Sequence, residues 1–272
     1  MKELTLKEIQ QETLHILVDV DYFCRRNNIQ YSLAYGTLLG AIRHDGFIPW
    51  DDDVDIVMTR QNFNRFMLEF GSFKGYKLVS PFDKGSYVAY ARVCDMSRTI
   101  AKCRVPWSKY NTGIWIDIFP VDSIDNSENE HRIRHHKLNH KWRKLGILRG
   151  GKGQFSKDWP LTYNIKTLIK KVITLNGLGL RKQVETFIEE ISSPRFNKSS
   201  HCSQMAVCES FEFNDKSDYA EYTTHEFEGH QLMVSAQYDH ILQIRYGDYM
   251  CLPPKEQQIP KQSFSVRFYW KK

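Results

Sequence analysis

Four aspartates within six residues are the feature of this sequence best suited to chemistry. The run is Asp51-Asp52-Asp53-Val54-Asp55-Ile56, in which acidic and apolar residues alternate. On an extended chain successive side chains point to opposite faces, so we expect Asp51, Asp53 and Asp55 to project together. Three carboxylates on one face repel one another unless a cation lies among them. Mg²⁺ fits best, with Mn²⁺ as the alternative, because hard ions favour carboxylate and phosphate oxygens. A solvated acidic turn is the competing interpretation, although such a turn would not need the apolar flanks.

A second stretch places a single carboxylate within an apolar strand, Ile114-Trp115-Ile116-Asp117-Ile118-Phe119. The isoleucines are expected to face one way and Asp117 the other, together with the two aromatic residues. A charge in such surroundings is costly unless it is paired or bound to a metal. We therefore expect Asp117 to join the metal ligands, and an ion pair with an arginine is the alternative.

Upstream of the aspartates, Tyr35-Gly36-Thr37 stands where a strand is expected to turn into a helix. A glycine and a small hydroxyl residue at such a turn let backbone N–H groups approach a phosphate. Gly-Thr turns are common, so this signal depends on the nearby aspartates for its weight. The sequence has no Walker P-loop, nucleophile elbow, HExxH or dinucleotide-binding pattern.

Mixed helical and strand patterns position these residues and predict an α+β fold. Thr5 and Glu8 form a capping-box pattern at the start of a helix that reaches Cys24. The other predicted elements are strands at Tyr31–Tyr35, Trp50–Met58, Tyr87–Cys94 and Gly113–Phe119, a helical turn at Leu38–Ala41, and helices at Arg60–Phe70, 138–145, 165–173, Arg181–Ile191 and Ala236–Tyr246. A loop at Gly150–Gly153 is expected to separate two of these helices.

Charge is unevenly distributed along the 272 residues. Of the 38 basic and 32 acidic residues, fourteen and one respectively lie between His131 and Lys182. This helical segment carries the apolar stripe Ile165, Leu168, Ile169, Val172 and Ile173. Such a segment suggests contact with a polyanion, for example a phosphorylated ligand, an acidic lipid or a nucleic acid. A solvated basic helix face is the alternative.

The overall composition excludes several classes of protein. The 41% hydrophobic and 26% charged content is typical of a globular chain, and no apolar run approaches the length of a membrane span. The six cysteines are scattered and the N-terminus lacks a signal-peptide pattern, so we expect reduced thiols and a cytoplasmic location.

Three sequence blocks together resemble a known family. The order of the Gly-Thr turn, the Asp-x-Asp strand and the later Asp strand is the layout of the polymerase-β-like nucleotidyltransferase superfamily. The blocks Tyr35–Ile56, Gly113–Asp122 and Tyr246–Tyr249, the last with its following Leu252-Pro253-Pro254, closely resemble the LicD family of phosphocholine transferases, whose relatives include fukutin-type enzymes. The basic middle of the chain is the part that the resemblance covers least.

The resemblance implies a nucleotidyltransferase-like mixed sheet with flanking helices and a metal-dependent phosphotransferase. Phosphocholine would move from CDP-choline to a sugar hydroxyl of a teichoic acid or lipopolysaccharide precursor, releasing CMP. In this view Asp51, Asp53, Asp55 and Asp117 hold the metal, and Asp117 could also accept the proton of the hydroxyl. The motif does not say which phosphorus is attacked.

The resemblance also implies a substrate-binding set. Gly36 and Thr37 would cradle phosphate, and Arg43 with His44 would face the departing CMP. A quaternary ammonium needs an aromatic face, for which Trp50 and Trp115 are candidates, although core packing is the usual role of such residues.

We divide the chain into a catalytic core (1–128), a basic helical segment (129–200) and a C-terminal part packed on the core (201–272). A lipid-linked acceptor would bring the enzyme to the inner face of the membrane, where the basic segment would contact anionic lipid. No nucleic acid partner is expected, because no binding motif accompanies the charge. The alternatives are transfer of phosphoethanolamine or of a sugar or alditol phosphate, and a non-catalytic protein of the same fold that binds a polyanion or a membrane.

Overall fold

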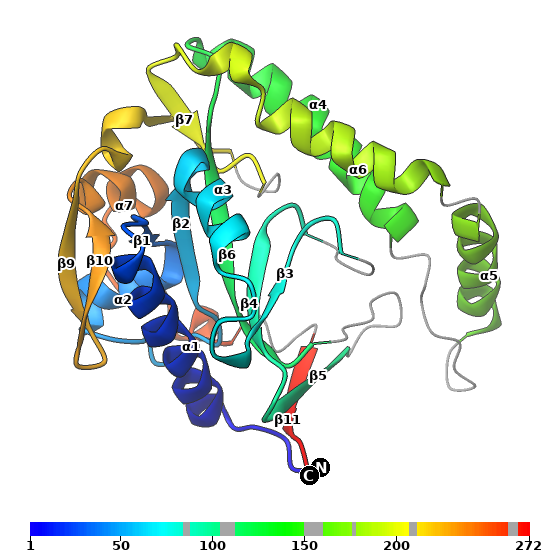
Figure 1. Cartoon of the computed structure of the whole chain (residues 1–272), viewed down its shortest axis with the longest axis horizontal. Coiled ribbons are helices and arrows are strands. Elements are labelled where there is room, and N and C mark those ends of the chain that lie inside the picture. Colours follow the sequence, from blue (N-terminus) through cyan, green and yellow to red (C-terminus); the bar gives the residue numbers. More distant parts are fainter. Residues whose placement is uncertain (84–87, 104–111, 150–159, 176–177, 207–210, 261–265) are drawn as a thin grey trace.

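The computed structural model describes residues 1–83, 88–103, 112–149, 160–175, 178–206, 211–260 and 266–272 (Figure 1). The α-helices are α1 (Leu6–Arg26), α2 (Tyr35–His44), α3 (Arg60–Glu69), α4 (Glu128–Arg149), α5 (Leu161–Leu175), α6 (Leu178–Ile191) and α7 (Tyr238–Tyr246). The strands are β1 (Ser32–Leu33), β2 (Asp55–Thr59), β3 (Lys77–Val79), β4 (Ala91–Asp95), β5 (Thr99–Cys103), β6 (Ile114–Ser123), β7 (His201–Ser203), β8 (Asn214–Asp215), β9 (Tyr222–Phe227), β10 (His230–Ser235) and β11 (Val266–Trp270). Single 3₁₀ turns lie at Phe73–Gly75, Pro194–Phe196, Lys216–Tyr219 and Lys255–Gln257.

The central sheet is mixed and runs in the order β1-β2-β6-β4-β3. β2 and β6 are parallel, and the other neighbours along this path are antiparallel. β6 extends beyond its partners and pairs through its far end with β7, which in turn pairs with β8. This arrangement confirms the expected α+β class with a mixed sheet core.

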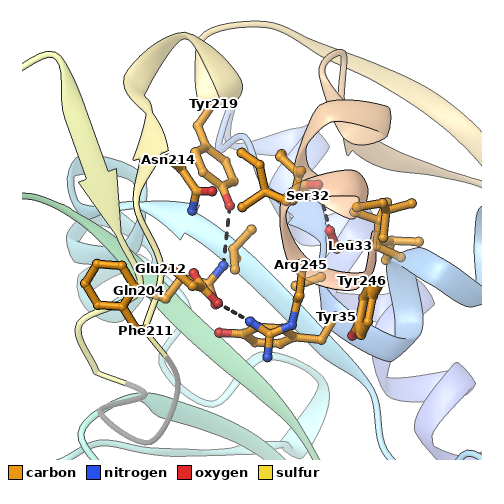
Figure 2. Close-up of a pocket in the computed structure, with 16 residues that line it drawn as sticks. Ser32, Leu33, Tyr35, Gln204, Phe211, Glu212, Asn214, Tyr219, Arg245 and Tyr246 are labelled. Atoms are coloured by element: carbon orange, nitrogen blue, oxygen red, sulfur yellow. Dashed lines mark hydrogen bonds and ion pairs between the residues drawn. The ribbon is translucent and has the colours of Figure 1, made fainter. Parts of the chain in front are cut away.

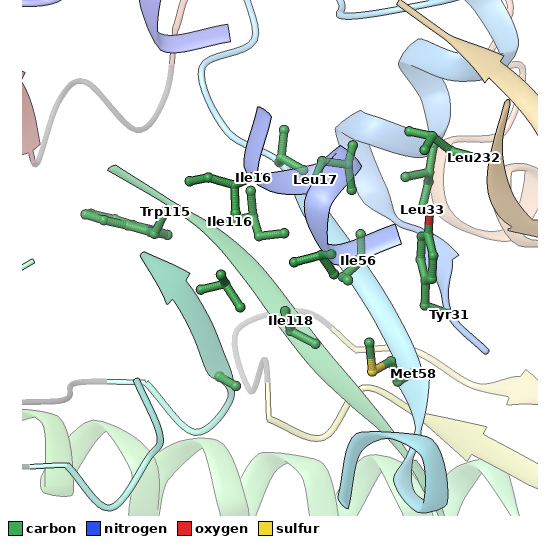
Figure 3. Close-up of a cluster of buried hydrophobic side chains, with 14 of the residues drawn as sticks. Ile16, Leu17, Tyr31, Leu33, Ile56, Met58, Trp115, Ile116, Ile118 and Leu232 are labelled. Atoms are coloured by element: carbon green, nitrogen blue, oxygen red, sulfur yellow. The ribbon is translucent and has the colours of Figure 1, made fainter. Parts of the chain in front are cut away.

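The main core lies between this sheet and the helices beside it. α1 supplies Ile16, Leu17 and Val20, which are all at most 1% exposed and contact the apolar side of the sheet (Figure 3). The predicted capping box starts α1, because Thr5 Oγ1 accepts from the Glu8 N–H and the Glu8 carboxylate accepts from the Thr5 N–H. Residues of β9, β10, α7 and β11 enter the same core, among them Leu232, Val234, Leu242 and Phe268.

Two strand predictions near the aspartates extend too far. The expected strand Trp50–Met58 begins only at Asp55, and the expected strand Tyr31–Tyr35 is reduced to Ser32–Leu33. Tyr35 instead adopts a left-handed φ of 49° and opens a ten-residue helix, where the sequence indicated only one turn. Alternation of side chains predicts an extended chain but does not say which part of it finds a pairing partner.

The hairpin of β9 and β10 was not predicted. Its turn consists of Glu228 and Gly229, both with positive φ (51° and 78°), which is the conformation of a two-residue hairpin loop. Glu-Gly is a weaker hairpin signal than Asn-Gly or Asp-Gly, and the flanking strands carry many exposed polar residues.

The basic segment folds as predicted into helices, which lie together on one side of the molecule (Figure 1). Leu138 and Leu145 of α4 are buried, and Trp142 stacks on Phe187 of α6 at 4.9 Å between ring centroids. Of the stripe on α5, Ile165, Leu168 and Ile169 are exposed, as is Leu161 at the start of the helix (48% to 74%). The side chains of Val172 and Ile173, the other two members of the stripe, lie outside the described part of the structure. The loop expected at Gly150–Gly153 and the start of the strand expected at Tyr87 lie outside the described residues.

Candidate active site

Strand register places three charged residues side by side in the middle of the sheet. Asp55 of β2 is the register partner of Asp117 on β6, and Asp117 is also the partner of Arg92 on β4. Partners on neighbouring strands share a face, so this side of the sheet presents carboxylate, carboxylate and guanidinium in a row. A hydrogen bond from the Asp117 N–H to the Val54 carbonyl (2.9 Å) holds the chain against β6 just upstream of Asp55.

The loop before β2 brings the remaining aspartates to the same place. One carboxylate oxygen from each of Asp51, Asp52 and Asp53 can be chosen so that all lie within 4.8 Å of one another. The loop is held by Gln10, whose amide donates to the Asp51 carbonyl at 2.9 Å. Asp52 is 2% exposed, and the sequence interpretation did not include it among the ligands.

The charges of the four predicted ligands act on one another. Burial raises the pKa of Asp53 well above its usual range, and the negative charges of Asp51 and Asp117 raise it further. Burial likewise raises the pKa of Asp55, with Asp53 and Asp117 adding to the effect. The structure thus brings together Asp51, Asp53, Asp55 and Asp117, and we call these four residues the carboxylate cluster. A divalent cation would offset this repulsion, and the all-oxygen donor set fits Mg²⁺ or Mn²⁺.

The position of Asp117 is compatible with both roles expected from the sequence, that of a metal ligand and that of an ion-pair partner. It belongs to the carboxylate cluster, and its Oδ1 also accepts a hydrogen bond from Arg92 Nε at 2.7 Å in a buried ion pair. Burial raises the pKa of Asp117, while Arg92 acts in the opposite direction. Arg92 was not singled out from the sequence, because only the register between β4 and β6 reveals its position.

Gly36 and Thr37 support the carboxylate cluster from the N-terminus of α2. A side chain at Gly36 would collide with Oδ2 of Asp51, so the glycine lets this carboxylate lie against the start of the helix, where a negative charge is favourable. The Thr37 hydroxyl accepts a hydrogen bond from the Asp55 N–H at 2.9 Å and so fixes the first residue of β2. Their predicted contact with phosphate stays a prediction.

Arg43 and His44 lie at the other end of α2. The Arg43 guanidinium donates to the carbonyls of Tyr249 (2.7 Å) and Cys251 (3.2 Å) and to Nε2 of His44 (3.1 Å). Burial lowers the pKa of His44, and the charge of Arg43 lowers it further. Among the contacts that the structure describes, neither side chain reaches the carboxylate cluster, and their predicted role toward CMP stays a prediction.

The two tryptophans expected to face a quaternary ammonium both contact the main core. Trp115 is 2% exposed, its ring meets Phe268 edge-on at 5.0 Å, and the Arg92 guanidinium lies 4.4 Å from its centroid. Trp50 is partly buried against the main core. Core packing was the alternative for both residues, and their role toward a ligand remains a prediction.

A group that sequence reasoning missed lines a cavity of about 290 Å³ next to the carboxylate cluster. Glu212 pairs with Arg245, whose guanidinium lies 4.0 Å from the ring centroid of Tyr35 (Figure 2). The Ala34 N–H donates to the Asp55 carbonyl, so Tyr35 stands directly beside the start of β2. Arg245 immediately precedes the Tyr246–Tyr249 block, but a single arginine in a basic chain gives no signal of its own.

Comparison with known proteins identifies the family of the chain. Residues 28–157 match the family model described as LicD/FKTN/FKRP, nucleotidyltransferase domain. Over 274 aligned residues the chain is 33% identical to the lipopolysaccharide cholinephosphotransferase LicD of Haemophilus influenzae, covering 96% of this chain and 97% of that protein. The chain belongs to the LicD family. The match confirms the expected phosphotransferase class and extends over the basic segment, where the three blocks alone gave least support.

Two shorter matches are with uncharacterised rickettsial proteins. The protein from Rickettsia typhi is 38% identical over 79 residues, which is 28% of this chain and 23% of that protein. The protein from Rickettsia prowazekii is 46% identical over 61 residues, which is 22% of this chain and 20% of that protein.

Proposed function

We propose that this LicD family member transfers phosphocholine from CDP-choline to a sugar hydroxyl of a lipopolysaccharide-type glycan precursor and releases CMP. The full-length similarity to a lipopolysaccharide cholinephosphotransferase carries the proposal. The carboxylate cluster at the junction of β2 and β6 supports it, because phosphoryl transfer depends chiefly on positioning and on charge neutralisation.

The proposal assigns Mg²⁺, or Mn²⁺ in its place, to Asp51, Asp53, Asp55 and Asp117. When bound, such an ion neutralises phosphate charge and orients the phosphoryl group. The bond that forms joins the acceptor oxygen to the phosphorus of phosphocholine, and the bond that breaks joins this phosphorus to the oxygen of CMP. The hydroxyl proton passes to a carboxylate, for which Asp117 is our candidate because burial raises its pKa.

Arg92 is proposed to hold Asp117 in place for this step. Its Nε occupies one carboxylate oxygen, Oδ1, at 2.7 Å, and its guanidinium is itself kept in position over the Trp115 ring. We propose that Thr37 likewise positions Asp55, because its hydroxyl accepts a hydrogen bond from the backbone N–H of Asp55.

The identity of the donor head group is the part of the proposal that an experiment can test most directly. The purified protein would be incubated with Mg²⁺, a lipopolysaccharide-type acceptor, and CDP-choline, CDP-ethanolamine or CDP-ribitol, followed by measurement of CMP. CDP-choline is expected to give the fastest acceptor-dependent release. A faster rate with either other donor would replace phosphocholine by that head group, and no release with any donor would favour a non-catalytic role. Teichoic acid precursors are the alternative acceptors for the same assay.

We also propose that α5 contacts the anionic surface of the membrane on which the acceptor is built. No helix in the described part of the chain is both long and apolar enough to cross a bilayer. The exposed stripe of Leu161, Ile165, Leu168 and Ile169 lies within the basic segment, and a helix of this composition suits the headgroup zone of an anionic surface.

A further inference from the structure

The cavity beside the carboxylate cluster is formed by elements that are far apart in the sequence. Its walls come from β1, β2, the start of α2, the segment between β7 and the Lys216–Tyr219 turn, and α7 (Figure 2). At about 290 Å³ it lies at the lower limit of small-molecule pockets, so it suits one ring or head group rather than a complete nucleotide donor.

Three buried polar atoms of the lining residues lack a hydrogen-bond partner within the described structure, namely Gln204 Oε1, the Tyr35 hydroxyl and Glu212 Oε2. Gln204 is 6% exposed, and its Nε2 donates to the Tyr219 hydroxyl at 3.4 Å, whereas its Oε1 is buried and unpartnered. The hydroxyl of Tyr35 is also buried and unpartnered. Buried polar atoms are rarely left in this state, because each costs free energy comparable to a lost hydrogen bond. A ligand that offers N–H or O–H donors would satisfy them.

Arg245 gives the cavity a fixed donor. It is held by the ion pair with Glu212 and by the Tyr35 ring 4.0 Å away. Glu212 is 8% exposed, and its main-chain carbonyl is bonded to the buried His131 ring of α4 at 3.0 Å. The guanidinium has five N–H groups, so it retains donors for a ligand after pairing with Glu212. The cavity therefore offers one fixed cationic donor and one fixed amide acceptor.

The cavity and the carboxylate cluster meet on β2, where Val57 lines the cavity and Asp55 belongs to the cluster. The Ala34 N–H donates to the Asp55 carbonyl at 3.0 Å, and the next residue along the chain is Tyr35. The charges of Asp55 and Asp51 act on the Tyr246 hydroxyl, and the charge of Asp55 acts on that of Tyr35. A ligand whose phosphates lie at the cluster would place its next group in or near this cavity.

We propose that this cavity binds the cytosine base of the CDP-linked donor. The inference rests on the proposed function for the identity of that donor. Cytosine carries an exocyclic amine that can donate to Gln204 Oε1, and a ring nitrogen and carbonyl oxygen that can accept from Arg245. Tyr219, Tyr246, Leu33 and Val57 provide aromatic and apolar walls for a planar ring.

The choline head group is the other part of the donor that could enter, and the observations favour the base. A trimethylammonium group has no N–H, so it would leave Gln204 Oε1 unsatisfied. Its positive charge would also lie beside Arg245, which already covers the Tyr35 ring. The only carboxylate among the lining residues is that of Glu212. Its Oε1 pairs with Arg245, and its buried, unpartnered Oε2 requires an N–H or O–H donor, which trimethylammonium lacks.

Comparison of the affinities for two pyrimidine nucleotides tests this proposal independently of transfer activity. Dissociation constants for CMP, UMP and phosphocholine would be measured by calorimetry with Mg²⁺ present, because uracil replaces the amine by a carbonyl. The wild-type protein is expected to bind CMP roughly tenfold or more tightly than UMP, since the wrong base leaves a buried acceptor unpaired. Gln204→Met, which has a similar length and no amide, is expected to abolish this preference. Gln243→Met, at an exposed site on α7, is expected to retain it.

Each other outcome would overturn the assignment. Equal binding of CMP and UMP by the wild-type protein, or no binding of either, would show that the cavity does not read the base. Weaker phosphocholine binding by Gln204→Met, with the CMP preference intact, would assign the cavity to the head group. The wild-type comparison stands even if Gln204→Met does not fold. Turnover of CDP-choline without base discrimination would overturn this inference and leave the proposed function in place.

Discussion

Asp117 is held between a guanidinium on one side and two carboxylates on the other. Arg92 donates to it at 2.7 Å, and Asp55 is its register partner on β2. Arg92 thus stabilises the ionised form that repulsion and burial oppose. At the scale of single residues, the site balances buried like charges against one internal cation and a proposed metal ion.

Neutralising Asp117 separates its proposed chemical role from a purely structural one. We expect Asp117→Asn to abolish turnover while the melting temperature changes by less than about 4 °C, since the amide oxygen still accepts from Arg92 and repulsion with Asp55 is relieved. Differential scanning fluorimetry and CMP release would be compared on the same preparation. Arg92→Met is the contrasting variant and is expected to be strongly destabilised, by about 3–5 kcal/mol, because it leaves buried carboxylates uncompensated. A large fall in stability for Asp117→Asn with matching residual activity would indicate a structural ion pair alone.

Asp53 and Asp55 test the metal assignment. Replacing either by Asn preserves size but removes a charged ligand, so activity should fall roughly a hundredfold or more, as expected when several kcal/mol of transition-state stabilisation are lost. The apparent Mg²⁺ affinity, read from the dependence of CMP release on metal concentration, should fall as well. Asp19→Asn is a matched control, because Asp19 pairs with Lys74 away from the cluster. Near-normal turnover of Asp53→Asn, or full activity in EDTA, would contradict the assignment.

Residue alternation predicted the carboxylate cluster better than it predicted the strand that carries it. Asp51, Asp53 and Asp55 converge although β2 begins only at Asp55, and Asp52, which strict alternation would place on the opposite face, lies with Asp51 and Asp53. Arg92 and Arg245 could not be found in this way. Their positions depend on pairing between distant strands and on the packing of α7, neither of which leaves a local pattern.

At the scale of elements, long helices were predicted well and short strands poorly. Capping and apolar periodicity define α1 and α6 within the sequence itself, whereas β7 and β8 are two or three residues long and exist only through their partners. α2 was underestimated because its start at Tyr35 depends on a left-handed backbone conformation.

His131 of α4 contacts the cavity-lining residue Glu212, and its burial predicts that the stability of the protein depends on pH. The His131 ring is fully buried, and burial lowers its pKa to about 4. A depressed pKa means that the unfolded chain binds the proton more readily. The contribution of neutral His131 to stability is therefore complete above the unfolded value of about 6.5 and is lost as the pH falls toward 4. Between pH 7 and pH 5, the melting temperature of His131→Gln should fall less than that of the wild type. Parallel pH curves for the two proteins would show that His131 does not titrate in this way.

At the scale of the whole molecule, α5 lies near the ends of α4 and α6 and apart from the central sheet (Figure 1), and it carries the exposed residues Leu161, Ile165, Leu168 and Ile169. We expect the protein to sediment with anionic but not with neutral phosphatidylcholine vesicles, and salt should weaken the binding. Each Lys or Arg near an anionic surface contributes on the order of 1 kcal/mol, so Lys166, Lys170 and Lys171 changed together to Glu should release the protein.

The control for this experiment carries the same change of charge at exposed sites outside the basic segment, with Lys7, Lys77 and Lys255 changed to Glu. It should still sediment with anionic vesicles. Failure of the wild-type protein to sediment at low salt would remove the membrane role of α5 and leave the catalytic proposal unaffected. Equal loss of vesicle binding in both triple variants would show that the binding depends on net charge and not on α5.

Transfer of label tests the central claim most directly. CDP-choline labelled in the choline methyl groups would be incubated with the protein, Mg²⁺ and a lipopolysaccharide-type glycan precursor. We expect labelled glycan and CMP in equal amounts, with both products lost in Asp55→Asn and in EDTA. Release of free phosphocholine without labelled glycan, or attachment of the cytidine nucleotide to the acceptor, would contradict it.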